Sequence, residues 1–387
     1  MLFRSLHTAV KIAPHYSNPV LHIADASLVV EACSLLNNPE TRKPYIEEHN
    51  QKNAKLVKHF EESKKDRAPL TPIENSRKNA PPQSWSSNSA GVPDQLGLQV
   101  WKDISIEELL PYIDWSPFFW TWELKGTYPK ILENEKYGEQ AGKLFSDATE
   151  LLEKIVEEKI FRPSAVFGLW PAERRGDDVV LFEDEERTTE LKTFHFLRQQ
   201  KDKFRSLADF VAPENTINDY AGCFVVTTGS EVDSYAKTFE AAGDDYNSIL
   251  VKALGDRLAE ALAECLHKKI RDQWGYGKNE TLSKEELIKE KYRGIRPAPG
   301  YPSCPDHTEK RSIWQLLEVE DKLGATLTEN CAISPASSVA GYYFGLDSSK
   351  YFNLGKIGKD QIEDYAKRKE MTITEIEKWL APNLDYK

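Results

Sequence analysis

The chain has 387 residues, of which 40% are hydrophobic and 11% are aromatic. This composition supports a packed core and excludes wholesale disorder, and the length allows two or three domains. The 51 basic and 62 acidic side chains give a formal charge of -11. Because the sequence has no basic patch to offset this charge, nucleic acid is not expected as a partner.

The N-terminus and the cysteines indicate the compartment. The first residues, MLFRSLHTAVKI, lack the apolar core and the small-residue cleavage site of a secretory signal, and no segment is apolar for long enough to span a membrane. The five cysteines occur without C-x-x-C spacing, which argues against a disulfide framework and against a thiolate metal site. We therefore expect a soluble, cytoplasmic chain that makes no membrane contact.

The first hundred residues divide into two regions. Residues 1–38 contain apolar clusters, including a predicted strand at 19–24, but too few of them for an independent domain. We interpret this region as the C-terminal remnant of a preceding domain. Residues 39–100 combine a highly charged helix, 40–65, with a stretch rich in Pro, Ser, Asn and Gly that is typical of a linker. The main domain is predicted over residues 101–387.

Helices and strands do not alternate strictly within the main domain. Capping residues and apolar spacing predict helices at residues 103–112, 138–158, 244–274, 359–369 and 372–380. Short β-branched and aromatic runs predict strands at residues 164–170, 178–184, 222–228, 341–346 and 351–357. The predicted fold class is therefore α+β, a mainly helical domain with a twisted antiparallel sheet.

The common catalytic signatures are absent from the sequence. It contains no phosphate-binding loop, no dinucleotide fingerprint, no H-E-x-x-H pair and no G-x-S-x-G elbow. The eight histidines are scattered without the spacing of metal ligands. A hydrolase, a kinase and a metalloenzyme are therefore not predicted, and no catalytic or metal-binding residue is assigned.

A proline-rich segment, RGIRPAPGYPSCPDHTEK at 293–310, stands out. Its prolines fix an extended backbone that can present peptide groups to a flat heterocycle at little entropic cost. Arg296 offers a bidentate donor for a carboxylate, and Tyr301 offers an aromatic face. A rigid connection between helices is the more ordinary interpretation of such a segment.

Three other clusters have both a functional and a structural interpretation. Asp114 precedes six aromatic residues, an arrangement that suits an ammonium or sulfonium group but is more often core packing. The pair Tyr351–Phe352 is by itself an ordinary part of a strand. Asp256, Glu260 and Glu264 are spaced four residues apart on the longest predicted helix, and such a row is typical of a solvated helix face.

Taken together and in order, these segments resemble the activation domain of vitamin B12-dependent methionine synthase. The resemblance extends from about residue 100 to the end and includes the R-x-x-x-G-Y pattern that begins at Arg296. It rests on YIDWSPFFWTWEL, DDYNSILVKALGDRLAEA, RPAPGYPSCPDHTEK, SKYFNLGKIGKDQIEDYAKRK and WLAPNL.

The N-terminal stretch HTAVKIAPHYSNPVLHIADAS is similar to the final helix and strand of the cobalamin-binding domain that precedes the activation domain in the full enzyme. The D-x-H-x-x-G motif of that domain and the barrels for homocysteine and methyltetrahydrofolate are missing from the sequence. The resemblance therefore implies a methyltransferase component that does not methylate homocysteine on its own.

The resemblance implies a reactivation function in methionine biosynthesis. S-adenosylmethionine would bind here and would remethylate oxidised cobalamin held by a partner domain or subunit of methionine synthase, with an electron from flavodoxin or an equivalent reductase. Two alternatives stay open: a non-catalytic docking module, and an activator of another corrinoid methyltransferase.

The same resemblance assigns residues by motif position. Arg296 would pair with the methionyl carboxylate of the ligand and Asp114 with its ammonium group, while Ala298 would meet the adenine. The full set implied for S-adenosylmethionine is Asp114, Glu260, Glu290, Arg296, Ala298, Gly300, Tyr301, Tyr351 and Phe352. Asp256 is implied as a contact to the partner domain.

Overall fold

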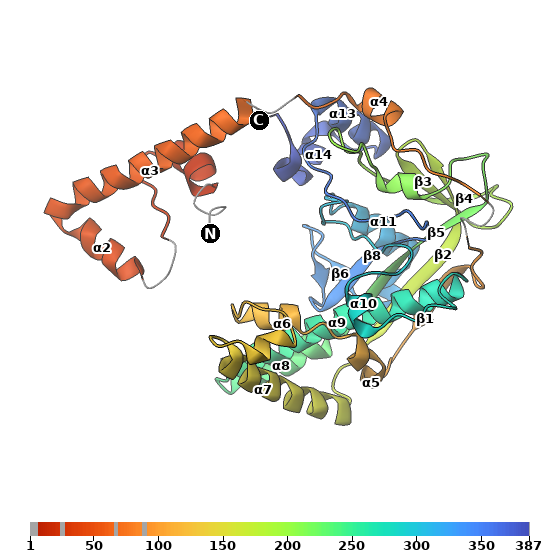
Figure 1. The fold of residues 1–387 in the computed structure, drawn as a ribbon, viewed down its shortest axis with the longest axis horizontal. Coiled ribbons are helices and arrows are strands. Elements are labelled where there is room, and N and C mark those ends of the chain that lie inside the picture. The colour runs from red at the N-terminus through yellow and green to blue at the C-terminus, as the bar shows by residue number, and fades with distance from the viewer. Residues whose placement is uncertain (1–6, 24–27, 66–68, 87–90, 387) are drawn as a thin grey trace. The chain divides into compact units, whose positions relative to one another are not determined.

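The computed structural model describes residues 7–23, 28–65, 69–86 and 91–386, and its contacts divide the chain into two compact units, 1–69 and 70–387. The first unit is helical. It contains a π-helical turn, Thr8–Ile12, and helices α2 (Val29–Asn37) and α3 (Pro39–Lys65) (Figure 1). The strand predicted at 19–24 is wrong over 19–23, which are irregular, and residue 24 lies outside the described residues.

An antiparallel sheet forms the centre of the second unit. Its long strand β2 (Ser164–Arg175) pairs along one edge with β5 (Asp219–Thr227), which pairs in turn with β8 (Ser338–Phe344). The other edge of β2 is shared by two strands. The first half pairs with β1 (Gly97–Trp101) and the second half with β3 (Asp178–Phe182), which pairs with β4 (Glu190–His195). The predicted α+β class with an antiparallel sheet is confirmed.

The period-two alternation of the strands divides the apolar side chains between two cores. On β2, Phe167 and Leu169 face a helical layer, whereas Val166 faces the opposite core. The layer on the first face contains the helices α5 (Ile106–Leu109), α6 (Ser116–Thr121), α7 (Gly138–Glu157), α8 (Glu231–Ala241) and α9 (Asp245–Gln273) (Figure 1). Because α9 contacts the sheet and the other helices of this layer, it is buried along most of its length.

The opposite face and the C-terminus complete the unit. Helices α11 (Glu309–Leu316) and α12 (Val319–Leu323) cover the second core. Helices α13 (Lys359–Arg368) and α14 (Ile373–Trp379) share a third, smaller core, and α14 begins with a capping box at Thr372. The remaining short elements are α4 (Ile73–Lys78), α10 (Lys284–Ile288), β6 (Thr326–Leu327) and β7 (Ile333–Ser334).

The strand predicted at 351–357 is wrong, because this segment pairs with loops and not with the sheet. The amide of Leu354 donates to the carbonyl of Pro302 at 2.9 Å, and the amide of Ile357 donates to the carbonyl of Asn383 at 2.9 Å. The segment is irregular and includes a φ of +81° at Gly355, and its hydrogen-bond partners are distant in sequence. Local pattern alone does not specify them.

A buried carboxylate makes the second unit sensitive to acid. Asp306 is 1% exposed and accepts hydrogen bonds from Lys369 Nζ at 2.7 Å and from the Tyr365 hydroxyl at 2.9 Å. Burial opposes the charge of this carboxylate, but Lys369 and the hydrogen bonds outweigh it and lower the pKa of Asp306. A lowered folded-state pKa stabilises the fold above the unfolded-state pKa of about 3.9, and this contribution is lost as the pH falls through the folded value.

We therefore expect the free energy of unfolding to decrease as the pH falls below about 4, partly through Asp306. In the Asp306→Asn variant, the free energy of unfolding at pH 7 should be lower, because Lys369 loses one of its two buried carboxylate partners, Asp306 and Glu309. The further decrease on acidification should be smaller than in the wild type. Urea unfolding between pH 7 and pH 3 measures both. If the free energy of unfolding decreased equally between pH 7 and pH 3 in the wild type and in Asp306→Asn, the role of Asp306 in acid sensitivity would be contradicted.

Candidate functional site

The proline-rich segment is fixed on both sides by backbone hydrogen bonds. On one side the amide of Tyr342, in β8, donates to the carbonyl of Pro297 at 2.8 Å, and Ile295 forms a bridge with Phe344. On the other side Leu354 donates to Pro302. The segment thus lies between the edge of the sheet and residues 351–354, so that segments distant in sequence meet at one place.

A tight turn within this segment requires glycine. The amide of Gly300 donates to the carbonyl of Cys304 at 2.7 Å, and the amide of Cys304 donates to the carbonyl of Tyr301 at 2.9 Å. Gly300 has a φ of +96°, and a Cβ at this position would overlap the imidazole of His307. The turn leaves the side chain of Tyr301 60% exposed.

Arg296 is held at two points. Its Nη2 donates to Glu264 Oε2 on α9 at 2.8 Å, and its backbone amide donates to the Tyr351 hydroxyl at 3.1 Å. The side chain is only 16% exposed, yet its buried Nε has no hydrogen-bond partner within the described part of the chain. Since buried N–H groups are almost always paired, this edge of the guanidinium is suited to an incoming acceptor.

Carboxylates and tyrosines surround Arg296. Partial desolvation raises the pKa of Glu290, and the nearby Glu264 and Glu260 carboxylates add to the rise although Arg296 opposes it. Burial raises the pKa of Tyr351 to about 12, against the effect of Arg296. Arg296 therefore acts electrostatically on Glu290 and Tyr351, and Glu260 acts on Glu290. The structure therefore brings the residues predicted on α9, before the proline segment and near residue 351 into one neighbourhood.

The acidic row on α9 runs from solvent into the protein. Asp256 is exposed and accepts a hydrogen bond from the Ser337 hydroxyl at 2.9 Å, Glu260 is half-buried, and Glu264 is 7% exposed. A solvated helix face is therefore the wrong interpretation for Glu264. The regular spacing of the three acids conceals this difference, because α9 is enclosed on all sides between Ala261 and Leu266.

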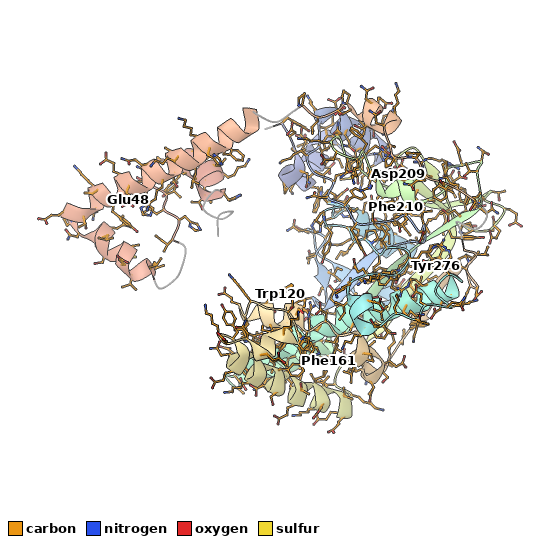
Figure 2. The ribbon with its side chains drawn as sticks, viewed as in Figure 1. Glu48, Trp120, Phe161, Asp209, Phe210 and Tyr276 are labelled. Carbon is orange, nitrogen blue, oxygen red and sulfur yellow. The ribbon has the colours of Figure 1, made fainter. Side chains whose placement is uncertain are left out.

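Asp114 has a local structural contact. Its Oδ1 accepts a hydrogen bond from the amide of Ser116 at 2.9 Å, at the start of α6. In the described ranges, no hydrogen bond or ion pair joins Asp114 to the Arg296 group. Of the aromatic residues that follow, Phe118 and Phe119 are fully buried, whereas Trp120 is 53% exposed on α6 (Figure 2). Core packing thus accounts for the two phenylalanines.

The two aromatic residues at 351 and 352 point to different surroundings. Tyr351 is 40% exposed and contacts Arg296 through its hydroxyl. The ring of Phe352 packs against Phe210, with centroids 6.4 Å apart, and against two apolar cores. Tyr301 and Tyr351 therefore supply the accessible aromatic faces, and the side chain of Phe352 supports the segment from beneath.

The cavities that stand out in the second unit are elsewhere. One of about 440 Å³ is lined by residues of α7 and α9 and of the loop that follows α6, among them Trp122, Asp147 and Tyr246. Another of about 270 Å³ is lined by Arg77, Arg174 and other residues around β2. Neither cavity includes a residue predicted to bind ligand, so cavity size alone does not identify the site.

Comparison with known proteins gives the class of protein to which this fold and the arginine–proline segment belong, an activation domain of a corrinoid enzyme. The family model described as "Vitamin B12 dependent methionine synthase, activation domain" matches residues 105–370, and the chain belongs to this family. The chain is also similar to the reactivation domain of MetH, whose crystal structure contains bound AdoHcy. That likeness has 52% sequence identity and a TM-score of 0.80, and it covers 83% of this chain and 100% of the solved one.

Among the described residues, no helix combines the length and the apolar character that crossing a membrane requires.

Proposed function

We propose that this chain binds S-adenosylmethionine beside Arg296 and presents its methyl group to cobalamin carried by the cobalamin-binding domain or subunit of methionine synthase. Flavodoxin or an equivalent reductase would supply the electron that restores oxidised cobalamin. The observation that carries the proposal is the unpartnered, buried Nε of Arg296, whose Nη2 is held by the carboxylate of Glu264. AdoHcy, the ligand of the similar MetH domain, is the demethylated form of S-adenosylmethionine.

The residues present fit this ligand. S-adenosylmethionine carries a carboxylate, an ammonium group and a sulfonium group. Arg296 offers a free N–H edge for the carboxylate, and Asp114, Glu260 and Glu290 are the acidic groups proposed for the cationic part. The exposed faces of Tyr301 and the partly exposed Tyr351 suit a sulfonium and a flat base.

The task of the protein in this function is orientation. The ring constraints of the proline segment and the turn at Gly300 hold Ala298 and Tyr301 in place before a ligand arrives, so little entropy is lost on binding. No general acid or base is required, because the sulfonium is already an activated methyl donor. Cobalamin, when held by the partner domain, supplies the nucleophile that accepts the methyl group.

The exposed end of the acidic row on α9, at Asp256, is the part that we propose contacts the cobalamin domain. Asp256 is exposed and its neighbour in the structure, Ser337, is fixed by the turn that follows β5, where Thr228 donates to the Ser337 carbonyl at 3.1 Å. We propose Asp256 as a contact to the cobalamin domain, residues 1–38 as the end of that domain, and residues 39–100 as the connection to the activation domain that begins at 101.

Replacing Asp114 with asparagine separates its structural hydrogen bond with Ser116 from its proposed interaction with the ammonium group of the ligand. Asn retains the oxygen that accepts from Ser116 but removes the negative charge. We expect unchanged thermal stability and binding of S-adenosylmethionine weakened about tenfold, as for loss of one charge-assisted hydrogen bond. Calorimetric titration and thermal unfolding check this. Asp114→Ala is the matched variant that removes both the hydrogen bond with Ser116 and the negative charge. A large loss of thermal stability in Asp114→Asn would support the core-packing interpretation.

The function itself is tested by methyl transfer. The purified chain is mixed with a cobalamin-loaded partner, reduced flavodoxin and S-adenosylmethionine labelled on its methyl group. We expect label on the cobalamin partner and an equal amount of S-adenosylhomocysteine, with each component required. Ligand binding without transfer to any cobalamin protein would favour the alternative of a non-catalytic docking module.

A further inference from the structure

A buried polar cluster extends from Arg296 into the protein. Glu264 Oε2 accepts from Arg296 and also from the Tyr292 hydroxyl at 3.2 Å. One turn further along α9, His267 stacks on Tyr343, with ring centroids 5.3 Å apart. Glu264, His267, Tyr292 and Tyr343 are all less than 10% exposed, since their exposed fractions are 7%, 1%, 8% and 1%. Arg296 is thus the outer member of a cluster and not an isolated surface residue.

At the inner end of the cluster, a buried arginine is paired with a glutamate. Arg271 is fully buried and forms two-oxygen hydrogen bonds with Glu280, at 3.0 Å and 3.1 Å from its Nε. Burial and the nearby arginines lower the pKa of His267 well below its usual value, so its imidazole is neutral. Arg271 Nη1 also lies 4.0 Å from Glu264 Oε1, so the charges of the inner pair are counted together with those around Arg296.

The charged groups of this cluster leave an excess of negative charge. Glu264 pairs with Arg296, and Arg271 pairs with Glu280. Glu260 and Arg257 influence the pKa of Tyr301, and Glu290 influences the pKa of Tyr351. Three positive side chains therefore stand against four negative ones. Glu264 is the member of this group that is buried and directly paired with Arg296, and its other oxygen, Oε1, has no hydrogen-bond partner among the described residues.

We propose that Glu264 is a positioning and specificity-determining residue: it holds the Arg296 guanidinium with Nε open to the ligand carboxylate, and it keeps the site negative so that the sulfonium substrate is preferred over the thioether product. This inference rests on the proposed function. The two ligands share the carboxylate, the ammonium group and the adenosine. They differ in the methyl group and in the positive charge on sulfur, so a preference set by charge appears in the ratio of their affinities.

Physical estimates give the size of the effect. A carboxylate several ångströms from a sulfonium in a partly buried site changes the affinity by about tenfold or more. The neutral thioether does not experience this attraction. Removal of the Glu264 charge should therefore act on S-adenosylmethionine more than on S-adenosylhomocysteine, whereas a general loosening of the fold would weaken both ligands by the same factor.

The test is titration of the intact chain with both ligands, for the wild type and for Glu264→Gln. The wild type should bind S-adenosylmethionine more tightly, and Glu264→Gln should reduce this preference about tenfold. Glu264→Asp keeps the charge and should restore the preference even if both affinities decrease. Glu309→Gln is the matched control, since it removes a buried carboxylate whose ion pair is with Lys369 and should leave the preference near that of the wild type.

The titrations distinguish a specificity-determining role of Glu264 from a purely structural one. Equal weakening of both ligands in Glu264→Gln would show that Glu264 has only a structural role. If that variant does not fold, the wild-type preference is the second measurement, and equal or tighter binding of S-adenosylhomocysteine would overturn the proposal. Failure of the wild type to bind either ligand would instead contradict the proposed function, so the two failures are distinguishable.

Discussion

Replacing Arg296 with alanine is expected to weaken S-adenosylmethionine binding by about 3 kcal/mol, or roughly two orders of magnitude in Kd. The variant removes a bidentate, charge-assisted partner for the ligand carboxylate. It also leaves Glu264 buried without its partner, because the pair is only 2.8 Å apart and both side chains are largely buried. Calorimetric titration of folded protein, well below its unfolding temperature, measures the loss.

Two further variants make this result specific. Arg296→Lys keeps the charge but not the planar fork, and we expect an intermediate affinity. Arg311→Ala removes an exposed arginine from α11, where its contact is with Trp379, and should bind as the wild type does. An unchanged affinity in Arg296→Ala would remove this residue from the site.

The largest effect on stability is expected for Arg198→Met, at about 4 kcal/mol. Arg198 is 2% exposed and donates to Asp177 at 2.7 Å and to both oxygens of Asp209 at 2.7 Å and 2.8 Å. Methionine fills a similar volume but leaves two buried carboxylates without this partner. Asp177 also binds Arg77 of α4 at 2.9 Å, so the loss should loosen the attachment of that helix.

Arg175→Met is the matched control for this network. Arg175 lies on the same sheet, but its side chain is 40% exposed and its partners include Glu190, which is 52% exposed. Such a surface pair contributes about 0–1 kcal/mol. Urea unfolding compares the stability of Arg198→Met and Arg175→Met. Similar unfolding midpoints for both would show that the buried ion pairs of Arg198 contribute no more to stability than the exposed ones of Arg175.

Elements with a strong local signal were predictable from the sequence. The leucine spacing of α9 and the cap at Asp244 specify a helix whose observed bounds are Asp245–Gln273. The alternating and apolar runs of β2, β3, β5 and β8 specify strands. The segment at 351–357 was not predictable in the same way, because its backbone pairs with Pro302 and Asn383, and neither partner is marked by the local pattern.

The candidate site around Arg296 could be predicted only in part from the sequence. The motif around Arg296 and Gly300 identified the segment, and the positive φ of Gly300 gives the physical reason for that glycine. Four-residue spacing does not distinguish Glu264, which is buried and pairs with Arg296, from the acids at the solvated end of the helix. Phe352 stays a prediction as a ligand contact, and the direction of its ring depends on tertiary contacts with Phe210.

The most direct test of the account is calorimetric titration of the chain with S-adenosylmethionine, performed alone and in the presence of the cobalamin-binding domain. We expect saturable binding of one ligand per chain, weakened by roughly two orders of magnitude in Arg296→Ala. A folded chain that binds no S-adenosylmethionine under either condition would contradict the assignment of the ligand and of the site.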